Sequence, residues 1–215
     1  MDARLAELLK LLDLERLEDN LFRGQSRDIG APQVFGGQVL GQALVAASRT
    51  VDARLVHSLH AYFLRRGDVN APIIFEVDRS RDGGSFTSRR VVAIQHGQQI
   101  LTMSASFQTV EPGLDHQTPM PPAPRPEGLR DLGELNAEIQ DRVPEKVRGF
   151  FRHQRPFEFR PVDPPDYLNP VRRAPLRQVW FRAVGRLPDD QPLHRCLLTY
   201  VSDYHLLETS TLPHG

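Results

Sequence analysis

The chain has 215 residues, of which 40% are hydrophobic, and its 27 basic and 27 acidic side chains give a formal net charge of zero. This length accommodates one large domain or two small ones with a real apolar core. Neutrality removes any electrostatic reason for the chain as a whole to bind nucleic acid or an acidic membrane. A single cysteine, Cys196, excludes an internal disulfide and a cysteine-based zinc site.

Targeting and metal-binding patterns are equally sparse. No apolar run approaches the roughly 18 residues that a membrane-spanning helix needs, and the N-terminus lacks the basic and apolar regions of a signal peptide. We therefore expect a soluble, cytoplasmic protein. No His-Glu-x-x-His motif or carboxylate cluster is present, so we predict no metal and no cofactor.

Two helices and a strand are predicted first. Leucines at i, i+3, i+4 and i+7 predict an amphipathic helix over residues 3–12, and a strand is predicted over 14–23. A second helix, over 36–49, is almost free of charge and must be buried on most sides. Gly37 and Gly41 share one face of this helix, and we expect a curling sheet to pack closely there.

Four strands with short connections follow. They are predicted over residues 56–64, 73–78 leading to a turn at 82–84, 86–95 and 100–110. In the last strand, apolar and polar side chains alternate, so one face is buried and the other polar. Connections this short require antiparallel pairing.

A proline-rich segment comes next, with most of the prolines between Pro112 and Pro175. Because proline fixes φ and lacks an N–H, this segment cannot be the interior of a regular sheet. We predict an extended connector that contains a helix within residues 129–151. Its aromatic side chains indicate that it packs against the domains rather than hanging free.

The chain then begins the strand-then-helix order a second time. A strand is predicted over 178–183, a helix over 193–207 and a turn over 210–215. Unless covered, the helix would expose Leu197, Tyr200, Val201, Leu206 and Leu207. We therefore expect either a longer natural protein or a partner chain that supplies the missing strands.

Ordered motifs along the chain carry a specific resemblance. They are LFRGQS at 21–26, VFGGQVLGQA at 34–43, HSLHAYFLR at 57–65, RDGGSF at 81–86, RRV at 89–91, QVW at 178–180 and SD at 202–203. Together they resemble the bacterial acyl-CoA thioesterase II (TesB-type) family.

The resemblance implies an α+β double-hotdog fold, in which a curled antiparallel sheet wraps a long central helix. The implied domains are a first hotdog at 1–110, a proline-rich connector at 111–175 and the start of a second hotdog at 176–215. It also implies hydrolysis of fatty acyl-CoA to free fatty acid and CoA by an aspartate, a threonine or serine, and a glutamine. Only the aspartate has a counterpart, Asp203; the other two would lie beyond Gly215.

The chemistry needs no enzyme nucleophile, because the thiolate of a thioester leaves readily and an oriented water suffices. The sequence has no Gly-x-Ser-x-Gly motif, and Cys196 has no evident partner. On a helix, Asp203 shares a face with Cys196 and Thr199, where desolvation would raise its pKa. We predict Asp203 as the catalytic base. Without the resemblance, an aspartate bonded to local backbone would be the preferred interpretation.

Two other functions remain open at this point. The alternative to the thioesterase is a non-catalytic acyl-CoA-binding or assembly module that lacks the C-terminal strands. A hotdog dehydratase would need a histidine on or near the central helix, and residues 35–47 contain none.

Substrate contacts are predicted at His57, Tyr62, Gly84, Ser85, Phe86 and Arg89. His57 and His60 are three apart on a strand, which predicts opposite faces, one in the core and one on the surface. The turn at 82–84 is first a hairpin turn and second a candidate for shaping the CoA entrance. Arg81, Arg89 or Arg90 would then meet phosphates. The exposed sheet edge predicts a homo-oligomer.

Overall fold

The computed structural model describes residues 1–215 as two compact units. The sheet unit comprises Glu7–Pro112 and Leu187–Asp203, and the connector unit comprises Met1–Ala6, Gly113–Arg186 and Tyr204–Gly215. Each unit contains its own sheet and is described by itself. The predicted domain boundaries after residues 110 and 175 stay a prediction.

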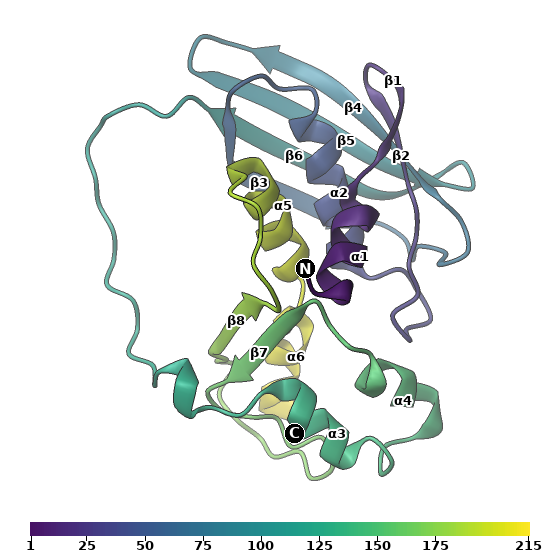
Figure 1. The fold of residues 1–215 in the computed structure, drawn as a ribbon, viewed down its shortest axis with the longest axis vertical. Coiled ribbons are helices and arrows are strands. Elements are labelled where there is room, and N and C mark those ends of the chain that lie inside the picture. Colours follow the sequence, from purple (N-terminus) through teal and green to yellow (C-terminus); the bar gives the residue numbers. More distant parts are fainter. The chain divides into compact units, whose positions relative to one another are not determined.

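The sheet unit is built on six antiparallel strands in the order β1-β2-β4-β5-β6-β3. They are β1 (Glu15–Glu18), β2 (Leu21–Gly24), β3 (Leu55–Phe63), β4 (Ile73–Asp82), β5 (Phe86–Gln95) and β6 (Gln98–Gln108). Helix α2 (Gly36–Ser48) lies across one face of the sheet and contacts β2 to β6 (Figure 1). This arrangement confirms the α+β class and the central helix.

The core lies between α2 and the sheet. Ten of the thirteen residues of α2 are buried, as its lack of charge predicts. In β6, Leu101, Met103 and Phe107 are buried, which confirms the period of two. The two buried glutamines of α2 hold the preceding loop, because Gln38 and Gln42 both donate to the Gln25 carbonyl oxygen at 3.0 Å.

The close packing at the glycines of α2 involves a helix, not the predicted sheet. A Cβ on Gly37 would lie 2.2 Å from the Tyr200 carbonyl oxygen, and one on Gly41 would lie 3.2 Å from the Tyr200 Cβ. Tyr200 belongs to α5 (Gln191–Val201). The sheet covers the bulkier side of α2, which leaves the glycine side to α5 and buries the apolar face of α5, Leu197 and Val201 included.

A β-bulge in β3 changes the faces of two histidines. The β3–β6 register shifts between Val56 and Ser58, which are paired with Phe107 and Ser106, so His57 is the extra residue. His57 and His60 are therefore both exposed. The prediction of one core and one surface histidine is wrong because it assumed an unbroken alternation.

The connector unit is more structured than an extended tether. It holds η1 (Pro126–Gly128), α3 (Leu132–Ile139), α4 (Glu145–Arg152), β7 (Phe157–Pro161), β8 (Val179–Ala183), α6 (Leu206–Thr211) and η2 (Leu212–His214). The helix predicted within residues 129–151 is two helices, because Pro144 lacks an N–H and stands as the N-cap of α4. Strand β7 was not predicted. Strand β7 can contain Pro161 because this proline is its last residue and the sheet has only two strands.

Three further elements differ from their predicted form. Helix α1 (Ala3–Leu12) is confirmed, but the strand predicted over 14–23 is the hairpin β1–β2. The helix predicted over 193–207 breaks after Val201, because His205 adopts a left-handed backbone with φ 66° that no α-helix continues through. Residues 206–211 then form α6, so the predicted turn at 210–215 instead holds the end of α6 and η2.

Candidate active site

Asp203 reaches the N-terminus of α2 from the turn that follows α5. Its Oδ2 accepts a hydrogen bond from the Gly37 backbone N–H at 2.9 Å, across 166 residues of sequence. Helix α2 has no cap of its own, since the N-cap residue Phe35 has no side-chain acceptor. A carboxylate from elsewhere therefore satisfies one of the unpaired N–H groups and meets the positive end of the helix dipole.

The space around this carboxylate requires glycine. A Cβ on Gly36 would lie 2.7 Å from Asp203 Oδ2 and 3.0 Å from Phe63 Cε1. The ring of Phe35 packs edge-on against Tyr200, with centroids 5.3 Å apart. Aromatic side chains from β3 and α5 thus border a carboxylate at a glycine-lined helix end.

Burial raises the pKa of Asp203 above its usual value, and the hydrogen bond from the Gly37 N–H opposes this without cancelling it. The direction agrees with the prediction from its apolar neighbours. The reason differs in part, because Asp203 lies two residues past the end of α5 rather than on a helix. What the sequence did not reveal is the partner, because Gly37 was expected only to allow close packing of a sheet.

Cys196 is not a competing nucleophile. It is free and buried in α5, and burial raises the pKa of its thiol to about 12. The thiol therefore stays protonated at neutral pH, and the thiolate is the reactive form of cysteine.

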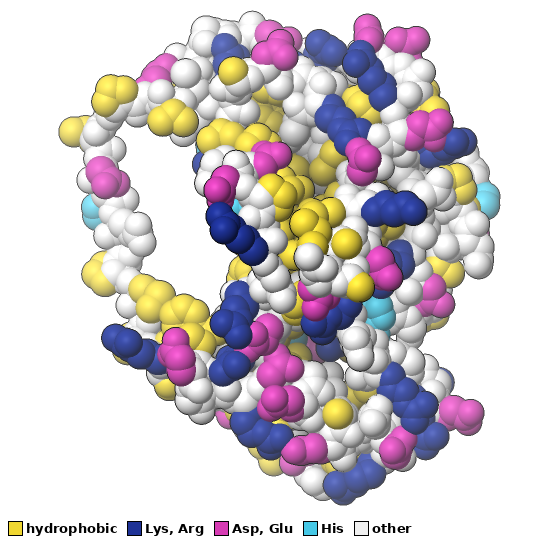
Figure 2. Space-filling model, viewed as in Figure 1, with side chains coloured by type: hydrophobic (Ala, Val, Ile, Leu, Met, Phe, Trp, Pro, Cys, Tyr) yellow, Lys and Arg dark blue, Asp and Glu magenta, His cyan; other side chains and the backbone are white.

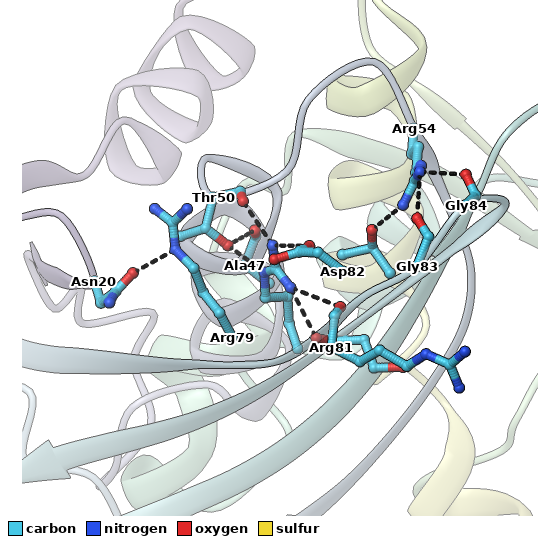
Figure 3. A network of polar contacts seen from close by, with 12 residues as sticks. Asn20, Ala47, Thr50, Arg54, Arg79, Arg81, Asp82, Gly83 and Gly84 are labelled. Atoms are coloured by element: carbon cyan, nitrogen blue, oxygen red, sulfur yellow. Dashed lines mark hydrogen bonds and ion pairs between the residues drawn. The ribbon is translucent and has the colours of Figure 1, made fainter.

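Arg89 lies inside the fold, at the other end of α2. Its five N–H donors are all used, on Thr50 Oγ1 and O, the Arg81 and Ser88 carbonyl oxygens, and Asp82 Oδ1. Thr50 in turn donates to the Ala47 carbonyl oxygen at 2.8 Å (Figure 3). Only 2% of Arg89 is exposed. The predicted contact with phosphates therefore has no free donor.

The turn between β4 and β5 is held by a residue that the sequence did not single out. Arg54 donates to the Gly83 carbonyl oxygen at 2.7 Å and also contacts the Gly84 carbonyl oxygen and Thr87 (Figure 3). Ser85 accepts a hydrogen bond from the Thr109 N–H at 3.0 Å through its carbonyl oxygen. Gly84 and Ser85 are thus parts of a pinned hairpin.

His57, Phe86 and Tyr62 lie on the outer face of the sheet. His57 hydrogen-bonds Ser106 Oγ at 2.8 Å, and its ring meets Phe86 edge-on at 5.8 Å. Tyr62 alternates with Phe63, whose ring packs toward α2, and is 64% exposed on the opposite side. The structure thus brings His57 and Phe86 together and separates both, with Tyr62, from Asp203.

Charges of both signs intermingle over the surface seen in Figure 2, with no face of one sign there. No group of three or more histidine, cysteine or acidic side chains is placed to hold a metal ion. None of the helices has both the length and the apolar composition needed to cross a bilayer.

The fold and the sequence are both similar to those of known proteins. A structure of a hotdog-fold protein from Alicyclobacillus acidocaldarius is similar over 93% of this chain and 69% of its own, with 18% identity and a TM-score of 0.68, which supports the fold alone. The structure of acyl-CoA thioesterase II TesB2 from Mycobacterium marinum is 44% identical, with a TM-score of 0.75, over 97% of this chain and 71% of that one. The class of protein is therefore a hotdog-fold thioesterase.

Sequence relatives and family models narrow the class. The model of the acyl-CoA thioesterase N-terminal domain matches residues 24–108, and that of acyl-CoA thioesterase matches residues 147–215. Human acyl-coenzyme A thioesterase 8 is 40% identical over 99% of this chain and 70% of its own length. Acyl-CoA thioesterase 2 of Haemophilus influenzae is 40% identical over 98% of this chain and 74% of its own. The chain belongs to the acyl-CoA thioesterase family, of the TesB type, and is an acyl-CoA thioester hydrolase.

Proposed function

We propose that the chain hydrolyses fatty acyl-CoA by water attack, with Asp203 as the base that holds and deprotonates the water. The observation that carries this proposal is the bond between Asp203 Oδ2 and the Gly37 N–H at 2.9 Å. That bond fixes the carboxylate through one oxygen. The other oxygen, Oδ1, has no partner in the protein and is free to accept a hydrogen bond from water.

The bond changes follow from the chemistry of a thioester. The water oxygen attacks the carbonyl carbon while Asp203 Oδ1 takes one of its protons. The tetrahedral intermediate then collapses, the C–S bond breaks, and the electron pair leaves on the sulfur of CoA. The proton passes to that thiolate or to solvent, which leaves a fatty acid and CoA and restores the carboxylate. A carboxylate with a raised pKa is a stronger base than an ordinary aspartate, which suits this role.

The alternative, a binding module without turnover, has less support. Even partial burial of a carboxylate is costly, and a module that only binds acyl-CoA has no need of a half-buried carboxylate at a helix N-terminus. Asp203 is such a group, with its pKa raised by burial. A catalytic role for Asp203 would explain why the chain retains a carboxylate whose burial is unfavourable.

Thiol release from a medium-chain acyl-CoA tests the assignment. Asn has the shape of Asp and keeps an oxygen for the Gly37 N–H, so Asp203→Asn should fold but lose about 10² to 10⁴ in kcat. Asp190→Asn is the matched control, because Asp190 caps α5 through the Leu193 N–H at 3.2 Å and Asn caps a helix equally well. Full activity in Asp203→Asn would overturn the assignment.

The proposal also covers how the chain assembles and where in the cell it is located. Strand β3 is an edge strand that pairs only with β6, and Phe63 and Leu64 at its end are 51% and 46% exposed. Edge strands invite pairing, so we expect a homo-oligomer. Sedimentation velocity should show smaller particles for Tyr62→Lys than for the unmodified chain, and equal particles would contradict pairing at β3. The cytoplasm is the proposed location, where a free thiol such as Cys196 stays reduced.

A further inference from the structure

One guanidinium in the connector unit has no anionic partner. Arg155 is half-buried, with its Cζ 4.8 Å from the ring centroid of Phe150 and 5.9 Å from that of Tyr204. No carboxylate lies within ion-pair distance of it, and it donates no hydrogen bond within the chain. Two aromatic faces therefore hold the cation in place while its N–H donors stay available.

Arg155 lines a cavity of about 1000 Å³ within the connector unit. Other arginines on the cavity wall are already paired: Arg4 with Asp2 at 2.7 Å, and Arg160 with Glu158. Arg152 pairs with Asp141 at 2.7 Å. Arg155 is thus the lining arginine whose charge is not neutralised by a neighbour.

The acidic side chains of the same wall are occupied as well. Asp2 is held by Arg4, and Glu158 is bound by both Arg160 and Arg182. Asp131 accepts the N–H groups of Gly133 at 2.8 Å and Phe159 at 3.3 Å. Glu134 alone has no such contact, and it is attracted to Arg130. A bound anion at Arg155 would therefore meet little repulsion from unpaired carboxylates.

The chemistry of the wall favours a particular anion. A guanidinium fork matches the oxygens of a phosphate, and the half-buried aromatic side chain of Phe151 lies on the same wall. A volume of about 1000 Å³ admits a ligand larger than a bare phosphate. We propose that this cavity binds a phosphorylated nucleotide, with Arg155 contacting a phosphate group.

Two sources could supply such a ligand: the nucleotide end of the acyl-CoA substrate, or a free nucleotide. The first source rests on the proposed function and the second does not. The experiment therefore needs one arm that involves turnover and one that does not.

The binding arm uses adenosine 3′,5′-bisphosphate, titrated by calorimetry into the intact protein. Loss of one charged hydrogen bond to phosphate should weaken binding about tenfold or more in Arg155→Gln and less in Arg155→Lys. Arg142→Gln changes an exposed arginine of the same unit that does not line this cavity, so this control should bind normally. Equal affinity in all variants, at unchanged melting temperature, would overturn the proposal.

The kinetic arm compares a medium-chain acyl-CoA with the corresponding acyl-pantetheine, which lacks the nucleotide. If the substrate's nucleotide occupies the cavity, Arg155→Gln raises KM for acyl-CoA about tenfold and leaves acyl-pantetheine unchanged. If Arg155→Gln weakens bisphosphate binding but leaves KM for acyl-CoA unchanged, the ligand is a free nucleotide. The cavity is then still a nucleotide-binding site. Binding by Asp203→Asn separates the two proposals, because it requires no catalysis.

Discussion

Each end of α2 lies beside a charged side chain, a buried one at the C-terminal end and a half-buried one at the N-terminal end. The two side chains differ in how many of their polar atoms are hydrogen-bonded within the protein. At the C-terminal end, Arg89 uses all five of its donors within the fold. At the N-terminal end, roughly 20 Å away by the rise of the helix, Asp203 accepts one bond from Gly37. A group whose polar atoms are all hydrogen-bonded stabilises the fold, whereas a half-buried carboxylate with one unbonded oxygen can still bind a substrate or water.

The largest effect on stability is expected at the C-terminal end of α2. Arg89→Met should lower the free energy of unfolding by about 2–4 kcal/mol, because it leaves the two oxygens of the buried residue Thr50 without the guanidinium donors. Urea unfolding would measure the loss. KM for acyl-CoA in the folded protein should stay unchanged. A rise in KM without loss of stability would instead support the phosphate contact that the sequence predicted.

A glycine substitution at the N-terminal end of α2 tests the difference between its two ends. Gly37→Ala places a Cβ 2.2 Å from the Tyr200 carbonyl oxygen, so α2 and α5 must separate, at a cost of about 1–3 kcal/mol. The shift also moves the N–H that holds Asp203, so kcat should fall. Gly84→Ala is the matched control, because a Cβ there meets nothing within 4 Å. Equal melting temperatures for both variants would show that the close contact is not a constraint.

The smallest expected effect concerns the stability of Asp203→Asn, and it has an unusual sign. Because the folded pKa of Asp203 is raised, protonation favours the folded state, and this contribution is lost as pH rises through the folded pKa. At neutral pH the Asn variant, with no charge to bury, should therefore be at least as stable as the parent. The difference should vanish below pH about 4, where both states of the parent are protonated.

A local cap provides the comparison for that result. Asp190→Ala removes the acceptor for the Leu193 N–H and should destabilise by about 1 kcal/mol at neutral pH. If Asp203→Asn destabilised the protein as much, Asp203 would be a structural cap like Asp190, and its catalytic assignment would weaken.

How much of the fold and of the site could be predicted depends on how far apart in the sequence the interacting residues lie. The alternation in β6 and the charge-free composition of α2 fixed the buried faces correctly, because they report burial residue by residue. The site required distant partners. Asp203 was identified through the family resemblance, while its contact with Gly37 depends on how α5 packs against α2. The sequence did contain one indication of this contact. A glycine pair begins the helix, and no local side chain is available to cap it.

The errors have physical causes of the same kind. A single extra residue in β3 moved His57 to the face of His60, which no simple alternation anticipates. Arg89 fits the alternation of buried and less buried residues along β5. That alternation does not say whether a buried guanidinium is hydrogen-bonded within the protein. The outward positions of His57 and Tyr62, away from Asp203, follow from this register rather than from residue type.

The most direct test of the central claim is the pH dependence of kcat/KM for a medium-chain acyl-CoA. If Asp203 acts as the base, activity must fall on the acid side as its carboxylate takes up a proton, with an apparent pKa above the ordinary aspartate value near 4. The residual activity of Asp203→Asn should lack this acid limb. An identical limb in the variant and the parent would contradict the account.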